Sequence, residues 1–271
     1  MRSVRLGQVF LAIAAASLAV WSLVYRHFAW QSVPGWLPWQ GAWIYGSAVI
    51  LLAASVGLCI ARTALASALV IGVYMAVVAA LSVSQIFSLP DGIGAYPFCE
   101  ALTSLVGAWL LYVLLHRESG ASGSALGSKV AVRIAQVLFG LTCVFYGWSH
   151  FVYADYTASM VPTWLPGHLP IAYFTGAGHV AAGVAIIVRV LPGLAATLEA
   201  TMMSLFGLLV WVPSFFAHPR PKWAAVPESQ WSELVVNLLL AAAAWIVAIF
   251  IWKGLRGRAG SQRSAGAFQL E

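Results

Sequence analysis

His179 is the residue of this sequence best placed to do chemistry. No Asp, Glu, Lys or Arg lies between Asp155 and Arg189, so this histidine sits in a long uncharged segment. An ionisable side chain in such a segment is by default a hypothesis for a functional site. Imidazole accepts and donates protons near neutral pH, so we expect a catalytic proton exchange with a ligand carbonyl or hydroxyl. The alternative is a neutral histidine that donates to Thr175, one turn earlier, or to a backbone carbonyl.

Six further polar residues are expected to bind the same ligand. They are Tyr146, His150, Thr175, His218, Glu233 and Asn237. Tyr146 and His150 lie about one helical turn apart, as do Glu233 and Asn237, so each pair shares a helix face. Each prediction has a structural alternative. His150 and the loop around His218 suit anchors at a membrane interface, and Glu233 suits the N-terminus of a helix.

The composition identifies the environment that must hold these residues. Hydrophobic residues make up 62% of the 271 residues and charged residues only 8%, with a mean hydropathy of +0.89. A water-soluble domain of this length cannot bury so much apolar surface. We therefore expect an all-α, polytopic membrane protein whose first partner is the lipid bilayer. The net charge of +6 requires no nucleic-acid partner, because the basic residues flank the apolar segments.

The charged residues divide the chain into segments of the length that one membrane crossing requires, about 20 residues. We expect eight transmembrane helices. Their predicted ranges are 6–26, 40–61, 64–87, 96–116, 131–152, 169–190, 195–217 and 230–252. The first range resembles a signal peptide, but its apolar run is too long for one, so we expect a retained helix. Pro213 should bend the seventh helix.

The Lys and Arg residues predict the orientation in the membrane. With a cytoplasmic N-terminus, eleven of the 14 basic residues lie in cytoplasmic segments, and only Arg26, Arg220 and Lys222 lie outside. This distribution follows the positive-inside rule, so we expect both termini in the cytoplasm. The expected location is the inner membrane of a bacterium. His179 would then lie about 15 Å below the outer surface.

The sequence contains two copies of one unit. The recurring features are His27-Phe28 and His150-Phe151, then Val33–Pro38 and Val161–Pro166, then Glu100 and Glu233. Because each copy has four predicted helices, the copies should insert the same way up, as a parallel repeat of two four-helix bundles. We expect a first unit at 1–117, a Gly- and Ser-rich cytoplasmic linker at 118–129, a second unit at 130–253 and a basic disordered tail at 254–271.

The three cysteines predict no thiol mechanism borne by this chain alone. Cys59, Cys99 and Cys143 are far apart in the sequence, without the spacing of a Cys-x-x-Cys, haem-attachment or zinc motif. Cys99 and Cys143 both fall toward the outer side, which allows a disulfide between them. The sequence also lacks a phosphate-binding loop, a dinucleotide-binding fingerprint and a Ser-His-Asp pattern. No metal site is expected.

Three motifs of the second copy follow one another at Gly147–Phe151, Val161–Gly167 and Thr175–Gly183. Together they resemble the DoxX family of four-helix membrane proteins, and the resemblance covers about residues 130–250 best. It implies a tandem DoxX-like protein. Some family members are associated with quinone-linked or thiol-linked membrane oxidoreductases, including a thiosulfate:quinone oxidoreductase subunit. Where the family has a Glu in its second helix, this chain has His179 in one copy and Val49 in the other.

Three functional hypotheses follow. In the first, the chain is a quinone- or thiol-linked redox subunit whose second bundle binds a quinone-like or lipid-like ligand from the outer face. In the second, it is a non-catalytic scaffold for a partner oxidoreductase. In the third, two histidines on different helices hold haem b. The first two are favoured, and they differ in whether the chain is itself an enzyme. Transport is disfavoured, because no pair of broken helices occupies matching positions at mid-membrane.

Overall fold

The computed structural model describes residues 2–28, 37–88, 92–120 and 123–267, with side chains as far as Gly257. Within these ranges the chain is helical and has no strands. Eight helices are long and apolar enough to cross a membrane, which confirms a multi-pass membrane protein. Residues 33–36 of the first Pro-rich motif, including Pro34, lie outside the described residues.

The eight long helices follow the predicted ranges closely. They are α1 (Arg2–Tyr25), α2 (Gln40–Cys59), α3 (Ala64–Ser88), α4 (Ala95–Glu118), α5 (Lys129–Val152), α7 (His168–Val188), α8 (Pro192–Phe206, continued by η3 and α9) and α10 (Pro227–Ala267). The shorter elements are η2 (Ala125–Gly127), α6 (Ala154–Met160), the π-helical turn η3 (Gly207–Trp211), α9 (Val212–Ser214) and η4 (Lys222–Ala224). The sequence did not predict α6, which lies between α5 and α7.

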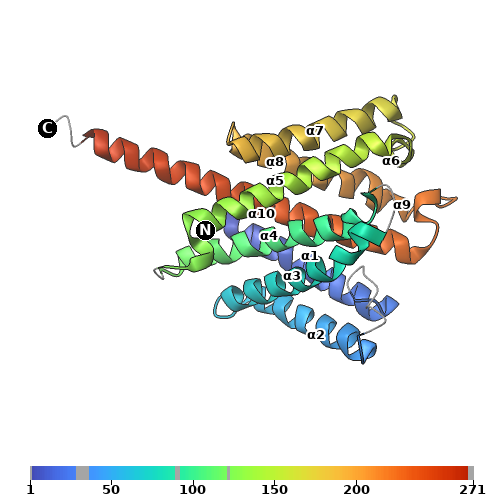
Figure 1. Cartoon of the computed structure of the whole chain (residues 1–271), viewed down its shortest axis with the longest axis horizontal. Helices are drawn as coiled ribbons and strands as arrows, with labels where there is room; N and C mark the ends of the chain where they lie inside the picture. The colour runs from blue at the N-terminus through green and yellow to red at the C-terminus, as the bar shows by residue number, and fades with distance from the viewer. Residues whose placement is uncertain (1, 29–36, 89–91, 121–122, 268–271) are drawn as a thin grey trace.

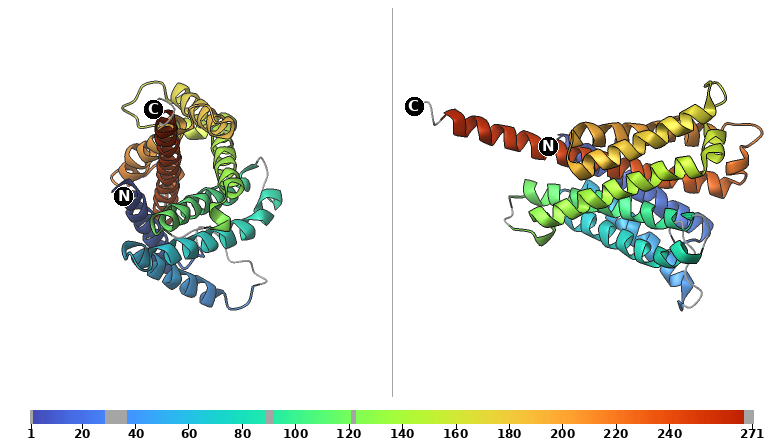
Figure 2. Two further views of the ribbon diagram at one scale, coloured as in Figure 1. Left: turned by 90° about the vertical axis from the view of Figure 1, so that its left-hand side faces the viewer. Right: turned by 45° about the horizontal axis from the view of Figure 1, so that its top comes forward.

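The helices form three layers around α10. Helices α5, α7 and α8 lie on one side, α2 and α3 lie on the other, and α1, α4 and α10 lie between them (Figures 1 and 2). Helix α10 packs against α1, α4 and α8, and it is the most buried of the eight candidate spans. It therefore connects the two halves of the chain.

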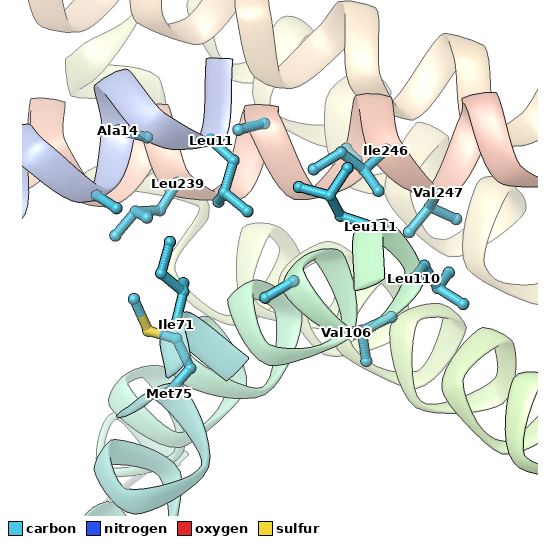
Figure 3. Close-up of a cluster of buried hydrophobic side chains, with 14 of the residues drawn as sticks. Leu11, Ala14, Ile71, Met75, Val106, Leu110, Leu111, Leu239, Ile246 and Val247 are labelled. Carbon is cyan, nitrogen blue, oxygen red and sulfur yellow. The ribbon is translucent and has the colours of Figure 1, made fainter. Parts of the chain in front are cut away.

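The apolar core lies where α1, α3, α4 and α10 meet (Figure 3). Its labelled side chains are Leu11, Ala14, Ile71, Met75, Val106, Leu110, Leu111, Leu239, Ile246 and Val247. In a bilayer the surrounding lipid is as apolar as these side chains, so close packing rather than exclusion of water stabilises the contact. Gly107 permits it: a Cβ atom at this position would lie 2.5 Å from the Cβ of Ala243 on α10.

Glycines also bring α5 and α7 unusually close together. Gly140 lies against Gly183, and Gly147 lies against Gly176 about two turns away. A Cβ atom added at Gly147 would lie 2.5 Å from the carbonyl oxygen of Gly176. Small residues at a helix crossing let the two backbones approach, as is common in membrane proteins. This crossing places His150 of α5 beside His179 of α7.

The chain after residue 253 differs from the prediction of a disordered tail. Helix α10 continues without a break to Ala267, which makes it 41 residues long. At about 1.5 Å per residue it measures about 60 Å, twice the apolar thickness of a bilayer. Figure 1 shows its last turns projecting beyond the bundle. Extending an existing helix adds one hydrogen bond for each residue fixed, so the composition of the tail alone misled the prediction.

Candidate functional site

A groove of about 690 Å³ lies between α7 and α8. Residues 157–165, in α6 and the segment after it, line one end, and residues 190–195, at the turn between α7 and α8, line the other. The wall is mostly apolar, and several of its residues, such as Phe174, Leu198 and Leu205, are exposed on the helix surface. The groove therefore opens sideways, on a face that membrane lipid would cover. Its polar lining includes His150, Thr175 and Glu199.

A buried His–Glu pair lies at the level of the middle of the groove. Nδ1 of His179 and Oε1 of Glu199 are 2.8 Å apart, and the side chains are 1% and 0% exposed. His179 lies about three turns into α7, and Glu199 lies about two turns into α8 from the opposite end of the bundle. His179 is thus at mid-span, and Glu199 lies about a third of the way along its span, Pro192–Ser214. The second carboxylate oxygen, Oε2 of Glu199, has no hydrogen-bond partner within the described part of the chain.

Pairing explains how the bundle tolerates these two side chains. An isolated carboxylate is costly to bury in an apolar medium, and the cost falls when a partner supplies a hydrogen bond and an opposite or shared charge. In membrane proteins such groups usually face the interior of the bundle and mark a functional path. Glu199 has one oxygen satisfied by His179, and the other is buried without a hydrogen-bond partner in the described part of the chain.

His150 forms the second polar contact of the groove. Its Nδ1 lies 2.9 Å from Oγ1 of Thr175 and 3.3 Å from the carbonyl oxygen of Ala172. The Thr175 hydroxyl donates its one proton to a carbonyl of its own helix, that of Ile171 or Ala172. Both partners of Nδ1 therefore accept, so Nδ1 of His150 carries a proton. In the neutral ring Nε2 is then an acceptor.

Aromatic rings pack the two histidines together. The ring centroids of His150 and His179 are 5.2 Å apart in an edge-to-face arrangement. Phe206 of α8 lies 6.0 Å from the first ring and 5.7 Å from the second, and Tyr146 lies 6.1 Å from His179. The structure thus brings together four of the predicted residues, Tyr146, His150, Thr175 and His179. Phe206, which lies among them, was not predicted from the sequence.

The hydroxyl of Tyr146 turns away from the groove. It lies 3.0 Å from Oγ1 of Thr103, which itself donates to Oγ1 of Thr142 at 2.9 Å. Thr142 donates to the carbonyl of Phe139 at 2.8 Å. Because each threonine uses its proton on the next acceptor, Tyr146 donates to Thr103. The phenol of Tyr146 therefore links α5 to α4, and only its ring reaches His179.

Asn237 lies behind the site and contacts the backbone of α8. Its Nδ2 donates to the carbonyl oxygen of Met203 at 3.1 Å, just before the π-helical turn that begins at Gly207. A π turn changes the spacing of the backbone hydrogen bonds, so a side-chain donor compensates at this point. The turn ends beside Pro213, where the sequence predicted a bend in this helix. Asn237 is not among the residues that line the groove.

Glu233 and His218 do not reach the groove, in contrast to their predicted role. Burial raises the pKa of Tyr156 on α6, and the nearby Glu233 raises it further; Glu233 also lies near Tyr96 and Glu100 of α4. His218 is exposed in the loop before η4. That loop approaches the groove through a different residue, because Trp223 packs against Trp211 of the groove wall with ring centroids 5.2 Å apart. Spacing along one helix could not indicate which neighbour each face would meet.

Glu199 is the functional candidate that sequence reasoning missed. It served only to mark the end of an uncharged segment, although the predicted seventh span, 195–217, already contained it. The rule that selected His179, an ionisable residue at membrane depth, applies equally to Glu199. In the structure α8 begins earlier, at Pro192, which places Glu199 deeper than predicted.

The two neighbouring histidines, His150 and His179, do not suit a haem held between them. No group of three or more His, Cys, Asp and Glu side chains gathers among them. Cys59, Cys99 and Cys143 are all free, so the disulfide that the sequence allowed is not formed. Two axial histidines must lie on opposite faces of a porphyrin. The rings of His150 and His179 instead contact each other edge to face, and no macrocycle fits between them.

No protein-family model matches the chain, and neither does any curated protein or solved structure. Its class therefore rests on its own geometry. The fold and the site define a multi-pass, all-helical membrane protein with an apolar groove along one face. The distinguishing feature within this class is the buried pair of His179 and Glu199.

Proposed function

We propose that the chain binds an elongated apolar ligand, quinone-like or lipid-like, in the groove between α7 and α8. The observation that carries the proposal is the combination of an apolar groove of about 690 Å³ with a few polar side chains in its lining, such as those of His150 and Thr175. Small-molecule sites typically measure about 300–1,000 Å³ and combine an apolar wall with a few placed polar groups. A lateral opening suits a ligand that arrives from the bilayer.

The proposed roles follow from the contacts. His150 and Thr175 anchor the polar head of the ligand, because both line the groove and are partly exposed. His179 and Glu199 are both fully buried, so proton exchange between His179 and the ligand runs through His150, whose ring contacts that of His179. In this proposal the chain is a quinone-linked redox subunit, and it works with a partner that supplies or removes electrons. If the redox reaction is thiol-linked instead, the partner must supply the reacting cysteines.

We also propose a tandem DoxX-like architecture with two parallel units and cytoplasmic termini. Helix contacts support it: the order α1–α2–α3–α4 in one half matches α5–α7–α8–α10 in the other. In each half the first helix donates a side-chain hydrogen bond near the end of the second, from Gln8 to Leu58 and from Arg133 to Ile187. The units also exchange neighbours, because α1 packs on α10 and α5 packs on α4. A two-fold axis along the membrane normal accounts for this pattern.

Blocking the groove tests the ligand proposal. Ala181 lines the groove with an exposed side chain, so Ala181→Trp should fill it. Val184 lies about one turn along α7, is exposed and is not part of the wall, so Val184→Trp is the matched control. Mass spectrometry of small molecules retained by the purified proteins should show a loss of about tenfold or more for Ala181→Trp alone. Equal contents in both variants and the wild type would refute the proposal.

The projecting end of α10 favours a second function, a scaffold for a partner oxidoreductase. The helix continues to Ala267, past the candidate span that ends at Gly257, and so offers a surface outside the bundle. A chain ending at residue 257 tests this function. Loss of a co-purifying subunit with unchanged ligand content would support the scaffold, and an unchanged set of partners would refute docking through this helix.

A further inference from the structure

We infer that the ligand of the groove is a lipid with an anionic phosphate head, and that the loop between α9 and η4 binds this head at the mouth of the groove. The mouth is the end that residues 157–165 line. The inference rests on the proposed function and decides between its two classes of ligand, quinone-like and lipid-like. The cationic residues of the loop are Arg220 and Lys222, with His218 beside them.

The loop lies at the same end of the bundle as the mouth. Figure 1 shows α6, which contributes to the mouth, and α9, which precedes the loop, at one end of the molecule. Trp211 lines the groove, and Trp223 of η4 packs against it edge to face, with ring centroids 5.2 Å apart. Lys222 precedes Trp223 in η4, so this contact places the backbone of Lys222 beside the groove wall.

Contacts at its base hold the loop in place. Nε2 of Gln230 on α10 donates to the carbonyl oxygen of Ser214 on α9 at 2.9 Å, and both residues are buried. The rings of Phe215 and Trp231 lie 4.6 Å apart, centroid to centroid, and join the same two segments. A loop that is already fixed loses less conformational entropy when it binds a ligand.

The loop carries positive charge without a counter-charge of its own. No Asp or Glu lies between Glu199 and Glu228 in the sequence. Arg220 and Lys222 are exposed and form no ion pair within the described residues, and Asp155 of α6 forms none there either. In the proposed orientation, two basic residues in one outer loop depart from the positive-inside rule, and an anionic ligand accounts for the departure.

A phosphate head fits these two side chains. The guanidinium group of Arg presents paired N–H donors to phosphate oxygens, and the ammonium group of Lys adds a compact positive charge. A quinone head is neutral and gains nothing from either charge. Basic residues near a membrane surface attract anionic lipids. We expect the two residues together to favour a phosphate-headed lipid about tenfold over a lipid with the same chains and no net charge.

His150 and Thr175 lie deeper in the groove than the loop. Thr175 is seven residues after His168, where α7 begins, which is about 10 Å along the helix. His150 contacts Thr175 and lines the groove at the same level. These two side chains then contact the part of the head that joins the phosphate to the apolar chains, and the chains lie along the apolar wall.

The test measures binding to the purified full chain by native mass spectrometry with three probes: dioleoyl phosphatidic acid, dioleoyl phosphatidylcholine and glycerol phosphate. The two lipids share their chains and differ in the charge of the head, and glycerol phosphate has the head without the chains. The wild-type protein should bind phosphatidic acid about tenfold more tightly than phosphatidylcholine. Glycerol phosphate should bind the weakest of the three.

The double variant Arg220→Gln with Lys222→Gln should lose the preference for phosphatidic acid and still bind phosphatidylcholine. Arg26→Gln is the matched control, because it removes an exposed positive charge at the end of α1, away from the groove lining, and it should keep the preference. Ala181→Trp should weaken the binding of both lipids, because their chains no longer fit the groove.

Equal binding of the two lipids by the wild-type protein would overturn the anionic head and leave the groove proposal standing. So would a preference that persists in the loop variant, or one that falls equally in Arg26→Gln. Glycerol phosphate bound as tightly as phosphatidic acid would replace the lipid with a free phosphate ester. Undiminished binding of both lipids by Ala181→Trp would overturn the groove proposal itself. The comparison of the two lipids needs no variant, so it decides the inference even if a variant fails to fold.

Discussion

His179 and Glu199 stabilise each other at a depth where neither side chain would be tolerated alone. Their hydrogen bond of 2.8 Å joins α7 to α8, and both side chains are fully buried. Removing one partner leaves the other as an uncompensated polar group, whereas removing both leaves an apolar contact between two helices. The pair therefore has a structural consequence that is separate from any role in ligand binding.

A double-mutant cycle measures this consequence. His179→Leu and Glu199→Leu should each destabilise the bundle, and the double variant should be less destabilised than the sum of the two. We expect a coupling energy of about 1–3 kcal/mol from SDS-induced unfolding in mixed micelles. The same cycle with His179→Leu and Glu233→Leu should be additive. Additivity between His179 and Glu199 would contradict the pairing.

At the level of single residues, the sequence alone indicated part of the candidate site. His179 stood out because no charged residue lies near it, and Thr175 followed from helical spacing. Glu199 carried the same signal and was used only as a boundary. Phe206 gave no signal, since an aromatic residue in an apolar helix is ordinary. Glu233 lies outside the groove lining, because helical spacing defines a face and not the helix that the face meets.

The crossing of α5 and α7 is the element that positions the two histidines. Its contact depends on glycines, since a Cβ atom at Gly147 would lie 2.5 Å from the backbone oxygen of Gly176. Gly147→Ala should therefore separate the helices and destabilise the protein by about 1–3 kcal/mol.

Gly46 of α2 is the matched control for this substitution. A Cβ atom there meets nothing within 4 Å, so Gly46→Ala should leave stability unchanged or raise it slightly. Unfolding midpoints of both variants in one micelle system provide the comparison. Equal effects of the two substitutions would contradict a close-packed crossing.

The contact between the π-helical turn η3 and Asn237 is a second one that positions the helices, because it joins α8 to α10. A Cβ atom at Gly207 would lie 2.6 Å from Oδ1 of Asn237, and Nδ2 of Asn237 holds the carbonyl of Met203. Gly207→Ala should destabilise the chain through this clash, and Asn237→Ala should cost about 1 kcal/mol through the lost hydrogen bond.

The combination of these two substitutions is informative. The alanine at position 207 should be less harmful in the Asn237→Ala background, because the atom it meets is gone. Thermal unfolding of the two single variants and the double variant measures the difference. A double variant as unstable as the sum of the two, or worse, would refute the contact.

The sequence predicted the long elements well, because a run of about 20 apolar residues between charges has one stable form in a bilayer, a helix. The elements it missed have no such periodic signal. Helix α6 is seven residues long, and the π turn depends on the contact with Asn237. The tail after residue 253 is polar and glycine-rich, but it continues an existing helix to Ala267.

At the scale of the whole molecule, contacts between the two halves hold the protein together. Helix α10 lies against α1 and α4 of the first half, and a Lys–Glu ion pair and a His–Glu contact cross the same boundary. Lys253 lies 2.5 Å from Glu118, and His27 lies 2.7 Å from Glu228. In the proposed repeat His27 and His150 are equivalent, and of the two only His150 lines the groove.

The proposed orientation can be tested with the native cysteines. Cys59 is exposed at the end of α2, whereas Cys99 and Cys143 are buried. With cytoplasmic termini, Cys59 should react with a membrane-impermeant maleimide in inside-out vesicles and stay unlabelled in right-side-out vesicles. Cys59→Ser should abolish the labelling of the inside-out vesicles. Labelling of Cys59 from the outside would reverse the proposed topology.

Photo-crosslinking with a diazirine-bearing fatty alcohol tests the central claim most directly. The adducts are located by mass spectrometry of peptides from protein in nanodiscs. The groove predicts adducts concentrated on residues 171–185 of α7 and 194–211 of α8 and η3, and their loss in Ala181→Trp. Adducts spread evenly over the exposed faces of α2, α3 and α7 would mean that the groove holds no specific ligand, and would contradict the account.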